Sequence, residues 1–274
     1  MPSQKEKAER LLELHQGPEV LVLANVWDVA SARIVEQAGF PAIATSSAAV
    51  ANSLGYPDGE RIPRAEMLAV VKRIAAKVAV PVSADLEAGY GDRPEDAELT
   101  ARGLIAAGAV GLNLEDGIDE SALVDVSAHV EKIRRIREVG ESLGVPVVIN
   151  ARTDVYLAQV GEPATRFEHA VRRLNAYREA GADSLFAPGV YDAETIGKLV
   201  QAVNGPLNIL AGPTIPSVLE LQRLAVRRLS FGSWPARAAL GLFSRFAREV
   251  RERGTFTTLN GWGIPYAELN RMVS

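Results

Sequence analysis

Short runs of apolar residues recur along the chain, and each is followed by a longer stretch in which charged residues are spaced three or four positions apart. The runs are typical of strands and the longer stretches of amphipathic helices. Because the runs are apolar at nearly every position, they favour parallel strands buried on both faces. The eight runs are residues 20–24, 42–46, 80–85, 110–114, 146–151, 184–187, 207–211 and 228–231.

A weak internal repeat supports the same division. Every second run follows an Ala-Gly pair, whose glycine would end a helix in the left-handed conformation. These pairs begin at Ala38, Ala107 and Ala180. Eight strand–helix units in about 250 residues match the size of a TIM barrel, and we therefore predict an α/β protein with a (β/α)8 barrel. A doubly wound sheet is the alternative.

No Gly/Ser-rich linker divides the chain, so residues 1–274 are predicted to form a single barrel domain. An extra helix is expected before the first strand, within residues 1–16. Residues 236–274 form a helical extension with an arginine-rich amphipathic helix at 236–253 and a last helix at 265–273. This extension exceeds what a closed barrel needs, and we expect it to pack on a neighbouring subunit of a homo-oligomer.

Composition narrows the class of function. With 47% hydrophobic and 23% charged residues, the 274-residue chain is an ordinary globular protein. The net charge of −4 offers no positive field for nucleic acid or an anionic membrane. The absence of cysteine excludes disulfides, thiolate metal sites and cysteine nucleophiles. No signal peptide or membrane span is evident, so a cytoplasmic protein that acts on small molecules is expected.

Polar residues cluster where the third, fourth and fifth runs end, and in a TIM barrel these strand ends form the active site. Asp85 and Glu87 follow one run and Glu115 the next. Crowded carboxylates repel unless a cation lies between them, and oxygen ligands without His or Cys favour Mg²⁺, or Mn²⁺. Asp85 is the first predicted ligand, with Glu87 and Glu115 next, directly or through water. Capping of the following helices is the alternative for Glu87 and Asp116.

Arg152 ends the fifth run, where an unpaired charge would be costly. It is predicted either to clamp an anionic substrate or to form an internal salt bridge with Asp154 or Glu115. The second run ends in Thr45, Ser46 and Ser47, small residues whose backbone amides can approach a carboxylate closely.

A serine nucleophile is the competing hypothesis for this serine-rich segment, and it requires a general base. All three histidines, His15, His129 and His169, fall in predicted helices away from strand ends. Anion recognition is therefore preferred.

Three further residues are ambiguous from their local sequence. Asp58 lies in a turn-forming loop, where aspartate is common for conformational reasons. Trp27 and Asp28 follow the first run. Trp27 is a candidate substrate contact, whereas Asp28 either touches substrate or caps the helix that begins near Val29.

Five segments between Asn25 and Arg152 together resemble one known family. In order they read NVWDVASARIVEQAGF, ATSSAAVANSLGYPDG, VSADLEAGYG, GLNLEDG and INARTD. Their order and spacing resemble the isocitrate lyase/phosphoenolpyruvate mutase superfamily, and the match spans about half of the chain.

The resemblance implies a TIM barrel that binds an α-oxo acid through Mg²⁺ and makes or breaks a bond beside the keto carbon, by way of an enolpyruvate-like anion. It implies Asp85 as the main metal ligand, with Glu87, Glu115 and Asp58 assisting or acting through water. Arg152 would hold the substrate carboxylate or stabilise the enolate, and the amides of residues 45–47 would bind the carboxylate. Members are commonly tetramers that exchange a C-terminal helix, so a tetramer or dimer is expected.

One departure from the family separates the possible reactions. Its lyases carry a Lys-Lys/Arg-Cys-Gly-His segment shortly after the residue that matches Glu115, and the cysteine is the catalytic acid or base. Here the stretch from Glu115 to Val124 has no cysteine, lysine or histidine. This favours a reaction that needs no cysteine, with water or Ser121 delivering the proton.

A lyase or decarboxylase acting on oxaloacetate or an isocitrate-like or 2-methylisocitrate-like acid is the main hypothesis, and a phosphonopyruvate or phosphoenolpyruvate mutase or hydrolase is the alternative. A phosphate-binding barrel that uses residues 211–214 and 231–233 is a weaker hypothesis. A non-catalytic oxo-acid binder is a further one.

Overall fold

All strands of the protein run parallel and form one continuous sheet in the order β1-β9-β8-β7-β6-β5-β4-β3-β2. The computed structural model describes residues 2–118 and 121–274. The strands are β1 Leu21–Leu23, β2 Asn25–Val26, β3 Ile43–Thr45, β4 Val82–Asp85, β5 Gly111–Glu115, β6 Val148–Arg152, β7 Ser184–Phe186, β8 Leu207–Leu210 and β9 Arg228–Ser230. All except β2 overlap a predicted run, and β2 lies just beyond the end of the first run, outside the predicted strands.

The sheet closes because two short consecutive strands, β1 within the first predicted run and β2 just after it, pair with opposite neighbours. β1 pairs with β9, and β2 pairs with β3. The side chain of Asn25 bridges the same junction, since its Nδ2 donates to the Thr45 carbonyl at 2.7 Å and its Oδ1 accepts from the Phe231 amide at 2.7 Å. The predicted barrel is confirmed, and a doubly wound sheet with two open edges is excluded.

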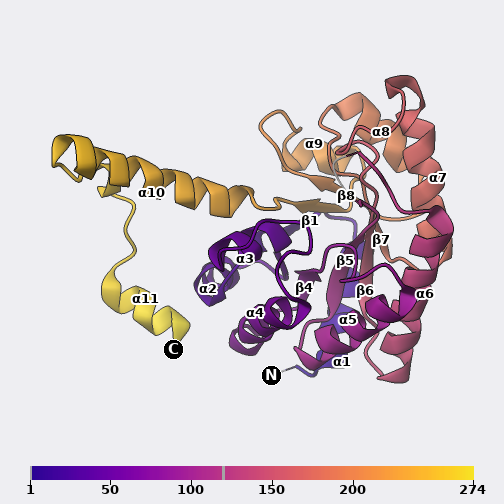
Figure 1. Cartoon of the computed structure of the whole chain (residues 1–274), viewed down its shortest axis with the longest axis horizontal. Coiled ribbons are helices and arrows are strands. Elements are labelled where there is room, and N and C mark those ends of the chain that lie inside the picture. Colours follow the sequence, from indigo (N-terminus) through magenta and orange to yellow (C-terminus); the bar gives the residue numbers. More distant parts are fainter. Residues whose placement is uncertain (1, 119–120) are drawn as a thin grey trace.

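Helices surround the barrel, and their apolar faces pack on the strands (Figure 1). Their bounds are α1 Gln4–Gln16, α2 Val29–Gln37, α3 Ser47–Ser53, α4 Arg64–Lys77, α5 Pro94–Ala106, α6 Val126–Ser142, α7 Arg166–Glu179, α8 Ala193–Ala202, α9 Val218–Arg223, α10 Trp234–Arg253 and α11 Tyr266–Val273, with short 3-10 turns at Pro163–Thr165 and Thr257–Leu259.

Helix α1 covers the end of the barrel at which the strands begin. The Gln4 amide donates to the carbonyls of Ile105 and Ala109, and the fully buried Leu11 lies so close to Gly111 that a Cβ there would meet it at 2.7 Å. Because α1 covers this end of the barrel, the opposite end, where the strands have their carboxyl ends, is the one left open for an active site.

The C-terminal extension leaves the barrel and returns to it. Helix α10 projects outward, and α11 lies back beside α2 (Figure 1). Arg33 donates to the Met272 carbonyl at 2.9 Å and Lys77 to that of Ser274 at 2.8 Å. In the part of the chain that the structure describes, no helix is both long and apolar enough to cross a membrane.

Candidate active site

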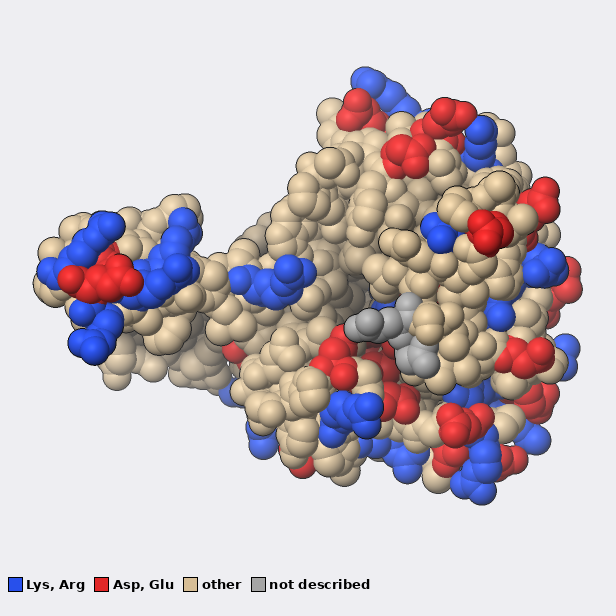
Figure 2. Space-filling view, turned by 45° about the horizontal axis from the view of Figure 1, so that its top comes forward, with Lys and Arg blue, Asp and Glu red and all other residues tan. Residues whose placement is uncertain are grey.

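Three neighbouring strands bring Asp85, Glu115 and Arg152 to the same end of the barrel. Asp85 ends β4, Glu115 ends β5 and Arg152 ends β6, and Glu115 and Arg152 occupy paired positions. A cavity of about 720 Å³ opens here, and acidic side chains gather beside the central hollow in Figure 2. Its lining includes Asp58, Glu60, Glu87, Lys132, Asp154 and the Glu115–Arg152 pair.

Asp85 is nearly buried and held from several directions. Its Oδ2 accepts hydrogen bonds from both the amide and the hydroxyl of Ser47, each at 3.0 Å, and its Oδ1 accepts one from Asn113 Nδ2 at 3.3 Å. Its own amide donates to Thr45 Oγ1 at 2.9 Å. The Ser47 groups expected to bind a substrate carboxylate therefore bind a protein carboxylate in this structure. Ser46 instead caps α3 by accepting from the Ala49 amide.

Glu87 has one carboxylate oxygen engaged and one without a partner. Its Oε2 accepts from the Glu60 amide, whereas the buried Oε1 has no hydrogen-bond partner among the described residues. Burial raises the pKa of Glu87 to about 7; the Glu60 amide opposes this, and the charges of Asp58 and Asp85 add to it. Glu87 does not cap a helix, because α5 begins later, at Pro94.

Asp58 joins this carboxylate group through Ser47, whose hydroxyl shares its single hydrogen between Asp85 Oδ2 at 3.0 Å and Asp58 Oδ1 at 3.3 Å. Burial raises the pKa of Asp58, and the neighbouring Asp85 raises it further. The loop position, ambiguous from sequence, thus lies beside the other acids.

The residues present fit a hard divalent cation in their chemistry. The unpartnered Glu87 Oε1 and the mutual repulsion of Asp58, Asp85 and Glu87 are both relieved by such an ion. Across residues 2–118 and 121–274, no three acidic or histidine side chains converge closely enough to hold an ion without help. Mg²⁺ typically keeps several waters and is held by only one or two carboxylates.

Arg152 is paired on both sides. Its Nη1 lies 2.6 Å from Glu115 Oε2, and its Nε and Nη2 donate to Asp154 at 2.6 and 2.9 Å. Burial lowers the pKa of Arg152, but Glu115 and Asp154 outweigh it, and the net pKa is above the ordinary value. The internal salt bridge predicted as one alternative is present, and its guanidinium also lines the cavity, so a substrate contact stays a prediction.

Asp116 stabilises the segment that carries Arg152 and Asp154. Fully buried, it accepts hydrogen bonds from Tyr177 at 2.6 Å, Thr153 at 2.7 Å and Arg173 at 3.0 Å, and from the Asp154 amide at 2.9 Å. The helix-capping alternative for Asp116 is therefore wrong, because α6 is capped by Asp125.

The histidines lie in helices, as predicted. His15 and His129 are buried, and burial lowers their pKa values to about 3 and about 4. His169 accepts a hydrogen bond from Arg173 at 3.0 Å on the outer side of the barrel wall. None of them lines the cavity at the strand ends.

The residues after the first run have mainly local roles in the structure. Asp28 caps α2 by accepting from the Ser31 amide at 2.7 Å, so its capping interpretation is confirmed. Trp27 is half-buried against the core, and its substrate contact stays a prediction. Ser121, the predicted proton source, is exposed beside residues 119–120, which lie outside the described residues.

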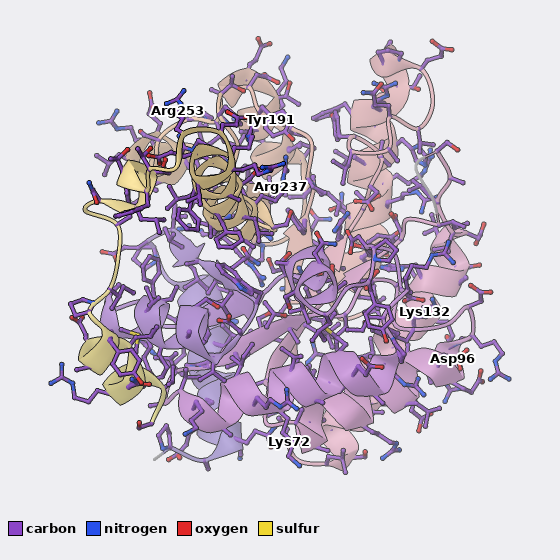
Figure 3. All side chains as sticks on the ribbon, turned by 60° about the vertical axis from the view of Figure 1, so that its left-hand side comes forward. Lys72, Asp96, Lys132, Tyr191, Arg237 and Arg253 are labelled. Atoms are coloured by element: carbon purple, nitrogen blue, oxygen red, sulfur yellow. The ribbon has the colours of Figure 1, made fainter. Side chains whose placement is uncertain are left out.

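Lys132 is a site residue that sequence reasoning missed. From α6 its Nζ donates to the carbonyls of Ala88 and Gly91 at 2.9 and 2.7 Å, which ties down the loop after β4 (Figure 3). Glu60 fixes the same loop by accepting from the Tyr90 amide at 2.5 Å. A lysine on an amphipathic helix normally faces solvent, so no local signal distinguishes Lys132.

Known proteins match this chain over most of its length. The family model of phosphoenolpyruvate phosphomutase matches residues 11–251. The chain is 30% identical to the 2-methylisocitrate lyase of Aeropyrum pernix over 89% of its length and 80% of the relative's, and 30% identical to the oxaloacetate decarboxylase of Rhodopseudomonas palustris over 87% and 82%. A crystal structure from Burkholderia cenocepacia, described as a lyase/mutase, is 39% identical, with a TM-score of 0.90 over 98% of this chain and 95% of that one.

Proposed function

Because the chain belongs to the phosphoenolpyruvate phosphomutase family, whose members are lyases and mutases, we propose that it is a Mg²⁺-dependent enzyme of small α-oxo acids. Mn²⁺ would serve as an alternative ion. The observation that carries the proposal is the meeting of Asp58, Glu87, Glu115 and Arg152 around one cavity, with Asp85 hydrogen-bonded beside them.

Asp85 would hold the ion directly, and Glu87 and Glu115 would reach it directly or through water. The Oε1 of Glu87 is the oxygen best placed to accept such a contact, since it is buried and has no hydrogen-bond partner among the described residues, whereas both oxygens of Asp85 accept hydrogen bonds. When bound, the ion supplies Lewis-acid polarisation of the substrate's keto oxygen.

Arg152 would bind the substrate carboxylate or the negative charge that develops on the keto oxygen. Its guanidinium is held in place by Glu115 and Asp154, and it reaches the cavity with its charge intact. Charge-assisted contacts of this kind are strong in a site from which water is excluded. Glu115 thus acts on the reaction through the orientation of Arg152 as well as through the ion.

Proton transfer needs a group whose pKa is close to the working pH. Asp58 is the candidate carboxyl, because it lines the cavity and its Oδ1 is positioned by Ser47; burial shifts its pKa upward from the ordinary value, which is the direction such a role requires. Water or Ser121 remains the proposed source of the proton that the product carbon receives.

The preferred reaction breaks the carbon–carbon bond between the carbon next to the keto group and the substituent on that carbon. In oxaloacetate this bond would release CO₂ and leave an enolate of pyruvate, which takes up one proton to give pyruvate. Two relatives bear the names oxaloacetate decarboxylase and 2-methylisocitrate lyase, and both reaction types are candidates here. The lack of cysteine between Glu115 and Val124 favours the decarboxylase over lyases that need a cysteine. A mutase or hydrolase of phosphonopyruvate or phosphoenolpyruvate is the second candidate.

The test is a set of assays on oxaloacetate, 2-methylisocitrate, isocitrate, phosphonopyruvate and phosphoenolpyruvate, each with Mg²⁺ and with EDTA. We expect turnover of one acid that EDTA abolishes and added Mg²⁺ or Mn²⁺ restores. If pyruvate with Mg²⁺ raises the melting temperature but no acid is consumed, the protein is an oxo-acid binder and the enzyme proposal fails.

We also propose a homo-oligomer, either a tetramer or a dimer, assembled through the C-terminal extension. Helix α10, seen nearly end-on in Figure 3, carries Phe243 at 62% exposure, and the segment after it carries Trp262 at 72%. Large apolar side chains gathered on one arm are typical of a protein interface.

A further inference from the structure

The interior of the barrel holds an arginine without a carboxylate partner among the described residues. Arg228 begins β9 and is 1% exposed. Its Nη2 donates to Asn113 Oδ1 at 3.2 Å, its Nη1 lies 3.3 Å from His15 Nε2, and its Nε has no hydrogen-bond partner in the described structure. A buried cation without a counter-charge is costly, so its presence needs an explanation.

Asn113 connects this arginine to the site. Its Oδ1 accepts from Arg228 and also from Asn150 Nδ2 at 2.7 Å, which fixes the orientation of the amide. The amide Nδ2 must therefore face Asp85 Oδ1, to which it donates at 3.3 Å. The positive charge of Arg228 is separated from the predicted metal ligand by a single neutral side chain.

Arg228 remains charged at neutral pH. Burial lowers the pKa of Arg228 to about 9, and Asp85 is the group that opposes this shift. His15 adds no charge of its own, because burial keeps its pKa near 3. Asp85 is thus the anion whose field stabilises the guanidinium.

We infer that Arg228 is the buried counter-charge of Asp85 and couples the binding of a divalent cation to the binding of an anionic ligand. The inference rests on the proposed function, since it takes Asp85 as the metal ligand. A cation on Asp85 cancels the charge that compensates Arg228, and in a weakly polarisable interior the two positive charges repel. An anion that binds next to the cation restores the balance. Arg228 therefore opposes the bare ion and favours the ion together with an oxo acid.

Three variants separate charge from structure. Arg228→Gln removes the charge but keeps an amide donor toward Asn113, and Arg228→Lys keeps the charge. Arg227→Met is the matched control: it loses the same charge from the adjacent position, where the side chain donates to the Gly17 and Pro18 carbonyls at 3.1 and 2.8 Å, outside the barrel.

Calorimetry would measure Mn²⁺ binding to the free protein and then oxalate binding to the Mn²⁺-loaded protein. In Arg228→Gln we expect Mn²⁺ to bind about fivefold tighter and oxalate about fivefold weaker, at the lower end of ordinary coupling between sites. The Arg228→Lys and Arg227→Met proteins should stay within about twofold of the wild type in both measurements. A role confined to packing would not produce changes of opposite sign.

Arg228→Met is the second variant if Arg228→Gln does not fold. It removes the charge with an apolar chain and should also both tighten Mn²⁺ and weaken oxalate, through loss of Arg228. Because Asn113 also faces Asp85, Asn113→Asp would add a charge at the metal ligand as well as against Arg228, so it is compared with the double variant Asn113→Asp/Arg228→Lys. If the wild type binds Mn²⁺ through Asp85 but neither Arg228→Gln nor Arg228→Met alters the two affinities in opposite directions, only this inference is wrong. If the wild type binds no Mn²⁺, the proposed function fails, and this inference fails with it.

Discussion

Glu115 and Arg152 occupy paired positions on β5 and β6, and their side chains meet at 2.6 Å where the strands open onto the cavity. A substrate carboxylate that reaches Arg152 must share the guanidinium with Glu115 and Asp154. The internal salt bridge and the predicted contact with substrate therefore involve the same Arg152 guanidinium and do not exclude each other.

Arg152→Ala should weaken oxo-acid binding by about 1.5–3 kcal/mol if the contact is a charge-assisted hydrogen bond. Titration of pyruvate or oxalate in the presence of Mn²⁺ measures it. Arg137→Ala is a suitable control, because it breaks a comparable pair with Asp183, at 2.5 Å, that does not line the cavity. Unchanged affinity in Arg152→Ala would leave Arg152 a purely internal salt bridge.

Asp85→Asn should abolish metal binding with little change in shape, since the amide can still accept from Ser47. Mn²⁺ binding followed by calorimetry or by the paramagnetic resonance of the free ion reports this loss. Asp183→Asn, which changes a half-buried carboxylate that does not line the cavity, should bind as the wild type does. Retained binding in Asp85→Asn would exclude Asp85 as the ligand.

Asp116→Ala should lower the free energy of unfolding by about 3–5 kcal/mol, because it leaves the buried Arg173 without a counter-charge. Urea unfolding measures the change. Asp125→Ala removes an exposed helix cap and should cost about 1 kcal/mol. Similar losses in the two variants would show that the Asp116 network contributes little.

His129→Phe should make the protein less sensitive to acid. Burial lowers the pKa of His129 from 6.5 to about 4, so below pH 6.5 the unfolded chain binds a proton that the folded chain refuses. The wild type therefore loses about 2 kcal/mol at this residue between pH 7.5 and pH 5. A phenylalanine ring is of similar shape to the imidazole, whose centroid lies 4.4 Å from that of the Tyr177 ring, so it can take the same place. Denaturant unfolding of both proteins at the two pH values tests this prediction. If the variant loses as much unfolding free energy as the wild type, His129 is not the source of the pH dependence.

Phe243→Glu should reduce the size of the assembly, because a charge replaces an exposed ring on α10. Sedimentation velocity measures the species present. Arg245→Glu, also exposed on this helix, is the control for added charge and should leave the assembly intact. A wild type that sediments as a monomer would overturn the proposal of an oligomer.

The strands were predictable because burial on both faces leaves a continuous apolar signature, and the barrel followed from their number. The second short strand just after the first run, β2, was not predictable, since the separation of β1 from β2 depends on the pairing of β1 with β9, some 200 residues away along the chain. Local patterns carry no information about such a partner.

For the site, the sequence identified which charges end the strands but not how they are arranged. Nothing local shows that Ser47 turns onto Asp85 or that Lys132 reaches over to the loop after β4. Arg228 stands at the start of an apolar run, where its direction into the barrel is decided by closure of the sheet. These contacts all join elements that are distant in sequence, and so they could not be predicted without the folded structure.

The side chain of Asn25 helps to hold the barrel closed, since it forms hydrogen bonds both to the end of β3 and to the backbone just after β9. A chain that stopped before Arg228 would keep its seven other runs but lose both the last strand and the hydrogen bonds of Asn25 to the backbone after it. It would expose two strand edges able to pair with other molecules. During synthesis the nascent protein therefore carries an incomplete sheet with aggregation-prone edges until nearly its last residues emerge.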